Sequence, residues 1–114
     1  MPRAPAAADV FNAVAESRRR DILVYLALRE RAVGDIVAAL RVAQPSVSKH
    51  LKVLREAGLV HVRRDGRQVF YRTNVLAIRP LQDWAAIFQR FWRHQLSRVR
   101  ERAERSASGK GGKP

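Results

Sequence analysis

The chain of 114 residues is long enough for one domain with a single hydrophobic core, and too short for two domains of ordinary size. Lysine and arginine outnumber the acidic residues 23 to 10, which gives a net charge of +13, and hydrophobic residues make up 46% of the chain. This balance favours a folded basic protein over a disordered polycation. The charge favours nucleic acid as the partner, with an acidic membrane surface as the weaker alternative. Cysteine is absent, which excludes disulfides, thiolate metal ligands and a cysteine nucleophile. No apolar run approaches the ~18 residues of a membrane span, so we expect a cytoplasmic protein with no membrane partner.

The N-terminal part of the chain is predicted to be helical after a short arm. Residues 1–8 are rich in alanine and proline, and we expect them to be flexible. A short helix over 9–15 follows, with an apolar face made of Val10, Phe11 and Val14. Ser17 is expected to cap the next helix, in which three core positions repeat at helical spacing, namely Ile22, Leu23 and Leu26.

Three consecutive arginines lie in the first turn of this second helix. Arg18, Arg19 and Arg20 oppose the helix dipole, which favours acidic residues at that end. Two explanations are open for this arrangement. The arginines either pair with nearby acids such as Asp9 and Glu16, or they face a phosphate group.

Two further helices follow with only three residues between them. Apolar spacing predicts a helix over 33–40 and another over 44–57, separated by Arg41, Val42 and Ala43. Pro45 suits the first turn of a helix, and Gly58 suits the position after its end. Two helices joined in this way are typical of a helix-turn-helix.

The second of these helices divides into two faces. Val47, Leu51 and Leu54 form an apolar stripe, with His50 at its edge as a packed structural histidine. The opposite face is polar and almost free of acids, with Ser48, Lys49, Lys52, Arg55 and Glu56 along it and Gln44 at the start. We therefore expect one face in the core and the other against a partner.

A β-hairpin is predicted next. Two runs rich in β-formers flank Asp65 and Gly66, a strong signal for a two-residue loop. This loop would place Arg64 opposite Arg67, and the further pairs would be Val62 with Val69, Val60 with Tyr71, and His61 with Phe70. A like-charge arginine pair at the tip, with Arg63 beside it, indicates a site for phosphate.

The last predicted element is a long helix from about Leu76 to Glu104. Its broad apolar face includes four aromatic residues, Trp84, Phe88, Phe91 and Trp92. This is more apolar surface than a small core needs, so we expect the aromatic face to contact a second subunit. The other interpretation is that the aromatic residues form part of a pocket for an effector. Residues 105–114 are expected to form a flexible basic tail, and 9–104 the folded domain.

The order of these elements is that of a winged helix-turn-helix, mainly α-helical with a small β-hairpin. The run VGDIVAALRVAQPSVSKHLKVLREAGLVHVRRDGRQVFYR at 33–72, with SRRRDIL at 17–23, resembles the ArsR/SmtB family of bacterial winged-helix repressors. The resemblance implies a homodimer joined through the first and last helices. It also implies that each subunit places its recognition helix in a major groove and its wing against the backbone.

The resemblance also assigns roles by matching position. Recognition-helix residues that would approach bases or phosphates are Gln44, Ser46, Ser48, Lys49 and Lys52, and wing residues that would contact phosphates or the minor groove are Arg63, Arg64 and Arg67. The dimer interface would contain Val10, Phe11 and Val14 from the first helix and the four aromatic residues of the last.

The chain departs from the family pattern at several positions. Arg41 stands where the family often has glycine, and Ala43 replaces the usual capping serine. The cysteines of the metal-sensing members are missing, and Asp83-Trp84-Ala85 lacks the histidine of the alternative metal motif, which leaves His94 without partners. We therefore expect no metal site and no cofactor.

The sequence favours a dimeric transcriptional repressor that binds an inverted-repeat operator in double-stranded DNA. No catalytic serine, histidine and carboxylate set, phosphate loop or pair of acids indicates an enzyme. The alternative is an architectural DNA-binding protein of the nucleoid type without sequence preference, and a protein-interaction module without a DNA role is a third interpretation. The inducing signal is left open between a small organic ligand, a protein partner and autorepression.

Overall fold

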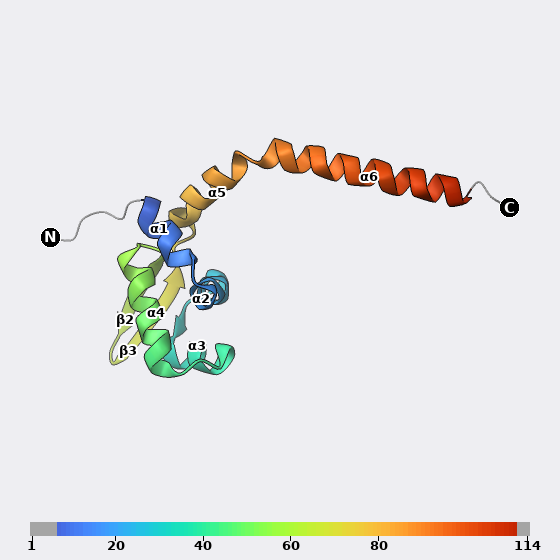
Figure 1. Ribbon diagram of the computed structural model, residues 1–114. Helices are drawn as coiled ribbons and strands as arrows, with labels where there is room; N and C mark the ends of the chain where they lie inside the picture. Colours follow the sequence, from blue (N-terminus) through green and yellow to red (C-terminus); the bar gives the residue numbers. More distant parts are fainter. Residues whose placement is uncertain (1–6, 112–114) are drawn as a thin grey trace. The chain divides into compact units, whose positions relative to one another are not determined.

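The computed structural model describes residues 7–111, and the chain divides into two compact units between Leu81 and Gln82. The first unit contains most of the regular structure, which Figure 1 shows in chain order: α1 (Ala7–Val14), α2 (Ser17–Leu28), β1 (Arg31–Ala32), α3 (Val33–Leu40), α4 (Gln44–Glu56), β2 (Val60–Asp65), β3 (Gln68–Thr73) and the 3₁₀ helix η1 (Val75–Ile78). Helix α5 (Arg79–Ala86) crosses the division, and α6 (Gln89–Gly111) lies in the second unit.

The core of the first unit is built from the helix faces that the sequence predicts. Ile22, Leu23 and Leu26 of α2 are buried, and so are Val47, Leu51 and Leu54 of α4. Ile36 of α3 and Leu59 after α4 complete the same cluster. Because these side chains occupy one side of each helix, the other side of α4 is left at the surface.

The turn between α3 and α4 contains a backbone conformation that is unusual for its residue. Arg41 ends α3 with φ +54°, in the left-handed region, and its N–H donates to the carbonyl of Val37. Ala43 precedes α4 and supplies no side-chain cap. Both departures from the family pattern thus fall at the places where glycine and serine would be favoured.

Helix α2 begins differently from the prediction. Glu16 is the residue before the helix, Ser17 is already its first residue, and no side-chain hydrogen bond caps this end. The predicted capping role of Ser17 is therefore wrong. Arg19 and Arg20 instead stabilise the junction with α1, as described below.

The sheet has three antiparallel strands in the order β1-β3-β2, of which the short β1 was not predicted. Asp65 pairs with Gln68, so the two-residue loop is Gly66 and Arg67 rather than Asp65 and Gly66. Gly66 has φ +62°, a conformation that glycine adopts at no steric cost at the first loop position of a type II′ turn.

The hairpin register therefore differs from the prediction by two residues. Arg64 lies opposite Val69, not Arg67, and His61 lies opposite Arg72, not Phe70. The predicted like-charge pair is wrong. Because the shift is two residues, each side chain keeps its predicted face of the hairpin.

The C-terminal part is not the single helix that the periodicity predicts. A turn at Ile87 and Phe88 separates α5 from α6, with the Ile87 N–H donating to the Trp84 carbonyl. Neither Gly nor Pro marks this break, so the sequence does not locate it. The division between the two compact units falls earlier, between Leu81 and Gln82 within α5, and lies inside the predicted single domain over 9–104.

Helical structure extends into both predicted end segments. Helix α1 begins at Ala7, inside the predicted arm, and α6 continues to Gly111, inside the predicted tail. The remaining parts of the predicted arm and tail lie outside the described residues. Across 7–111, no helix has the length and apolar character needed to cross a membrane.

Candidate nucleic-acid interface

The outer face of α4 carries the residues that the sequence analysis assigned to base and phosphate contacts. The buried stripe of this helix turns that face to solvent, and all five predicted side chains are exposed: Gln44, Ser46, Ser48, Lys49 and Lys52. The structure thus brings the predicted recognition residues together on one accessible surface.

The start of α4 is suited to an anion. Its first turn contains no acidic residue, Pro45 occupies it without an N–H to satisfy, and Ala43 offers no capping oxygen. The backbone N–H groups and the dipole of a helix start both favour a negative charge. Gln44 stands at this end, where an amide side chain can reach outward.

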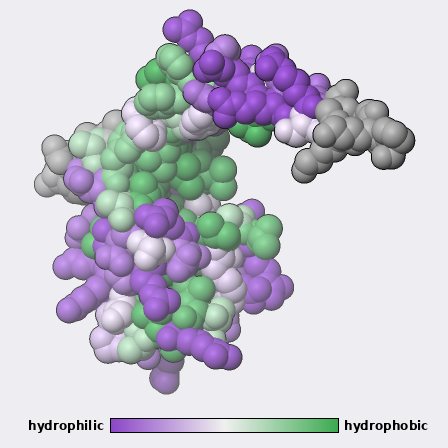
Figure 2. Space-filling model, turned by 45° about the vertical axis from the view of Figure 1, so that its right-hand side comes forward, coloured by the Kyte–Doolittle hydropathy of each residue, from purple (hydrophilic) through white to green (hydrophobic). Residues whose placement is uncertain are grey.

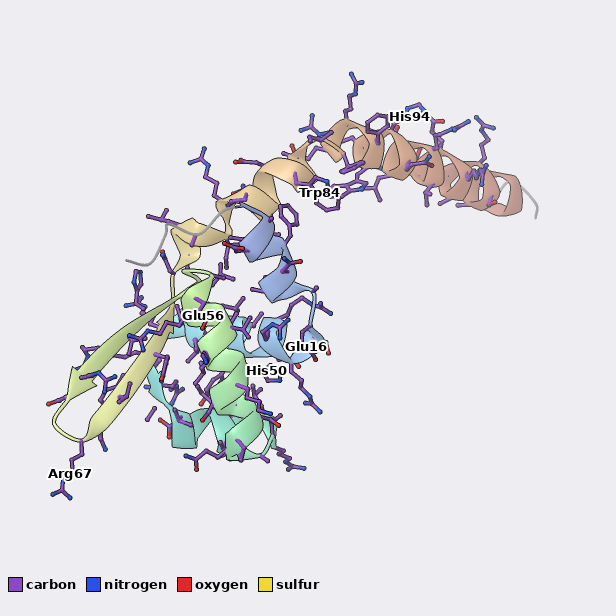
Figure 3. The ribbon with its side chains drawn as sticks, turned by 60° about the vertical axis from the view of Figure 1, so that its left-hand side comes forward. Glu16, His50, Glu56, Arg67, Trp84 and His94 are labelled. Atoms are coloured by element: carbon purple, nitrogen blue, oxygen red, sulfur yellow. The ribbon has the colours of Figure 1, made fainter. Side chains whose placement is uncertain are left out.

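Two lysines on α4 have no acidic partner among residues 7–111. Lys49 and Lys52 make no ion pair with any residue that the structure describes. The acid of the helix, Glu56, is its last residue and lies at the opposite end from Gln44 (Figure 3). The positive charge of the outer face is therefore available to a phosphate backbone.

The β2–β3 hairpin extends beside α4 and carries the predicted wing residues. Arg67 is a loop residue at its tip, and its side chain points away from the helices (Figure 3). Arg64 is exposed and stands opposite Val69, on the hairpin face whose other members, Val60 and Tyr71, pack on the core. Within residues 7–111, neither arginine has an acidic partner.

Arg63 has a different environment from its two neighbours. It stands opposite Phe70 on the other face of the hairpin, and its guanidinium lies 4.6 Å from the centre of that ring. Its Nε donates to both carboxylate oxygens of Glu30, at 3.1 and 3.0 Å, and its Nη2 donates to Oε1 at 2.6 Å. Asp65 lies 3.7 Å from Nη1.

These contacts shift the pKa values of both Glu30 and Arg63. The hydrogen bond from Arg63 holds the pKa of the Glu30 carboxyl below its ordinary value of 4.5, and the charges of Arg63 and Arg72 act in the same direction. Glu30 in turn raises the pKa of Arg63. Arg63 is thus already engaged with a carboxylate, unlike a free phosphate ligand.

The base of the hairpin is tied to the helices by buried and half-buried polar groups. The hydroxyl of Thr73 donates to the Leu23 carbonyl at 2.7 Å, and the amide of Asn74 donates to the Gly58 carbonyl at 3.1 Å. These bonds fix where the hairpin leaves the core. The orientation of the outer part of the hairpin, near its loop, depends on other contacts.

Two of the three consecutive arginines have a role that neither sequence explanation included. Arg19 Nε donates to the Ala13 carbonyl at 2.6 Å, and Arg20 Nη1 donates to the Val14 carbonyl at 2.9 Å. Cations at the end of a helix satisfy its free carbonyl groups and interact favourably with its dipole. Arg19 and Arg20 therefore hold the C-terminal end of α1.

Comparison with known proteins decides the family. Residues 16–62 match the model of the bacterial regulatory protein, arsR family. The arsenical resistance operon repressor of Escherichia coli is 35% identical over 107 residues, which cover 89% of this chain and 88% of the relative. The chain belongs to the ArsR family.

Solved structures of ArsR-type proteins have the same fold. The homodimeric winged helix-turn-helix DNA-binding domain from Mycobacterium bovis matches with a TM-score of 0.61 and 36% identity, over 71% of this chain and 78% of that one. The predicted winged helix-turn-helix is confirmed. The three-stranded sheet and the helix order described above are its parts.

Another relative matches over a shorter stretch of the chain. The transcriptional repressor SmtB of Mycobacterium tuberculosis is 45% identical over 67 residues, which are 59% of this chain and 50% of that repressor. The chain thus spans about half the length of SmtB.

The aromatic residues of this ArsR-family chain lie at the surface of the second unit. Phe91 and Trp92 are each 53% exposed, and Figure 2 shows hydrophobic side chains near the start of α6, beside its hydrophilic ones. The ring of Phe88 lies 5.3 Å from that of Trp84 and stacks with that of Trp92 at 6.5 Å. These contacts order the rings and leave much of their surface uncovered.

The α1 part of the predicted dimer interface is less accessible. Val10 is only 4% exposed and belongs to the core of its own protomer, so it has no surface to offer a second subunit. Phe11 and Val14 are half-buried, and Val14 packs against the same core. The helical spacing of Val10 predicts burial, but it cannot distinguish burial in the core from burial against a second subunit.

The three histidines of this ArsR-family member lie on three different elements. His50 is half-buried on α4 and His94 is exposed on α6 (Figure 3), while His61 is exposed in β2. Among residues 7–111, no three histidine, aspartate or glutamate side chains gather as a metal site would require.

Proposed function

We propose that this chain is a dimeric transcriptional repressor that binds an inverted-repeat operator in double-stranded DNA in the bacterial cytoplasm. The observation that carries the proposal is the outer face of α4, where Gln44, Ser48, Lys49 and Lys52 are exposed and the two lysines have no acidic partner in the described part of the chain. Glutamine can pair bidentately with adenine, and lysine can bond guanine or phosphate. The relatives named as repressors support the same function.

The wing supports this proposal through its charge. Arg64 and Arg67 stand on the hairpin beside α4, and both are exposed. Contacts from such residues to phosphates set the position of the protein on the duplex, while contacts from the recognition helix select the sequence. A binding surface with both kinds of residue favours a regulator over a purely electrostatic DNA binder.

The dimer is proposed from the exposed aromatic residues and from the homodimeric ArsR-type domain of Mycobacterium bovis. A twofold dimer presents two copies of α4, which read half-sites about 10 bp apart, one helical turn. An operator of this kind is an inverted repeat. The release signal is proposed to be something other than a thiolate-bound metal, since the chain has no cysteine.

The rival function is that of an architectural protein that uses the charge of +13 without sequence preference. Sequencing the genomic fragments that the purified protein captures separates the two. A repressor should recover a few promoter-proximal fragments that share an inverted repeat. Uniform recovery across the genome would favour the architectural protein, and no capture of duplex at low salt would favour the protein-interaction module.

A further inference from the structure

Glu30 joins two parts of the fold that are distant in sequence. It lies in the connection between α2 and β1, and Arg63 lies 33 positions later in β2. Three hydrogen bonds link the two side chains, and the guanidinium also lies over Phe70 of β3. The arginine is therefore held from two directions, by a carboxylate at its edge and by a ring at its face.

The placement of Arg63 separates it from the wing residues that are free to bind DNA. Successive residues of a strand point to opposite faces, so Arg63 and Arg64 lie on opposite sides of the hairpin. Arg64 is on the side that continues into the core, where α4 contacts β2. Arg63 is on the other side, together with Phe70 and Arg72.

We propose that Glu30 and Arg63 are positioning residues, which fix the β2–β3 hairpin against the α2–β1 connection so that Arg64 and Arg67 meet the DNA backbone. This inference rests on the proposed function. Thr73 and Asn74 secure only the base of the hairpin. Glu30 holds the hairpin further along, at Arg63, which lies two residues before the end of β2.

The competing role for Arg63 is that of a phosphate ligand. A phosphate that bound through Nε and Nη2 would have to displace Glu30, and Glu30 would then be left as an acid beside an anion. A phosphate that bound through Nη1 instead would meet Asp65, which lies 3.7 Å from that atom. The two roles make opposite predictions for removal of the acid.

The decisive variant is Glu30→Gln. If Arg63 is a phosphate ligand, the substitution frees its charge and strengthens DNA binding. If Glu30 is a positioning residue, binding weakens by about two- to fivefold even though the protein gains positive charge. Glu101→Gln, which adds the same charge from an exposed position on α6, is the matched control and should leave affinity within error.

The salt dependence of binding gives a second, independent readout. Binding of captured operator duplex is measured by fluorescence anisotropy over a range of salt concentrations. Arg63→Lys should weaken binding about as much as Glu30→Gln and leave the slope of log K against log salt unchanged. Arg64→Ala and Arg67→Ala should each reduce the slope by about 0.9, the loss of one phosphate contact.

The double variant completes the test. Glu30→Gln combined with Arg63→Lys should be no weaker than either single variant, because both remove the same contact. In the DNA-free protein, amide hydrogen exchange of β2 and β3 should speed up in Glu30→Gln, which measures directly whether Glu30 holds the hairpin in place.

Two results would overturn the inference: tighter or unchanged DNA binding by Glu30→Gln, or a slope reduced by about 0.9 in Arg63→Ala. Failure of the proposed function looks different. In that case the unsubstituted protein itself shows no preference for the captured fragment over random duplex.

Discussion

Arg41 shows the cost of a residue type that does not suit its backbone conformation. Its φ of +54° is unfavourable for any residue with a Cβ, by roughly 1–2 kcal/mol, and glycine loses part of that difference again through its greater freedom when unfolded. Arg41→Gly should therefore raise the free energy of unfolding by about 0.5–1 kcal/mol. Urea denaturation of the two proteins measures this difference in the free energy of unfolding.

The control for this prediction is Arg41→Ala, which removes the same side chain and keeps the Cβ. It should leave stability nearly unchanged. Equal stability of the glycine and alanine variants would show that the left-handed conformation carries no strain.

Gln44 and Lys49 are the residues from which base selection is expected. Replacing either with alanine should cost roughly 1–3 kcal/mol of operator binding and relax the preference at one base pair. The measurement compares affinity for the operator with affinity for duplexes changed at single positions. Arg55→Ala, on the same helix, is the matched control. An unchanged base preference in Gln44→Ala would show that its assignment to recognition is wrong.

At the residue scale, the sequence predicts side chains whose role follows from spacing. Val47, Leu51 and Leu54 are predicted correctly because a helix face repeats regularly. Glu30 and Arg19 are missed because their partners, Arg63 and the Ala13 carbonyl, are brought to them by tertiary structure. A single acid before a two-residue strand carries no local signal of an ion pair 33 positions away.

At the scale of elements, the existence of the hairpin is predicted and its register is not. Asp-Gly is a strong loop signal, but Asp65 is the last residue of β2, and Gly66 with Arg67 forms the loop. Both registers put the same side chains on the same face, so hydrophobic patterning cannot choose between them. The break between α5 and α6 is missed for a similar reason, because the apolar spacing continues across it.

The contact between the wing and the α2–β1 connection should depend on pH in one direction. Arg63 lowers the pKa of Glu30, so the pair is intact above the ordinary carboxyl value of 4.5 and is lost as pH falls through the lower value in the folded protein. The Arg63 Nε–H resonance in NMR spectra should hold its position from about pH 8 to about pH 5 and move only in more acidic solution.

Asp65 is the other acid near Arg63, 3.7 Å from its Nη1, whereas Glu30 accepts the hydrogen bonds from Nε and Nη2. Asp65→Asn should therefore keep the transition, and Glu30→Gln should abolish it. A transition that survives in Glu30→Gln would assign it to another group.

For the whole molecule, the exposed aromatic residues of the second unit are the proposed means of dimerisation. Phe91→Ser and Trp92→Ser should each weaken the dimer by at least about 10-fold, because each removes a large apolar side chain from a buried interface. Sedimentation equilibrium measures the dissociation constant. Operator binding should weaken with it, since half-site reading requires two copies of α4.

A matched control tests whether any exposed apolar side chain would have the same effect. Leu28 of α2 is 89% exposed, and Leu28→Ser should leave the dimer intact. If Phe91→Ser and Trp92→Ser leave it intact as well, the aromatic residues serve another purpose, such as an effector pocket.

The central claim is that α4 reads a DNA sequence. Its most direct test is a competition at fixed salt between the captured genomic fragment and random duplex of the same length, with the dissociation constants measured for both. We expect the captured fragment to bind at least ~10³-fold more tightly, as specific regulators do. Affinities that agree within a few-fold would contradict the claim and identify an architectural DNA-binding protein.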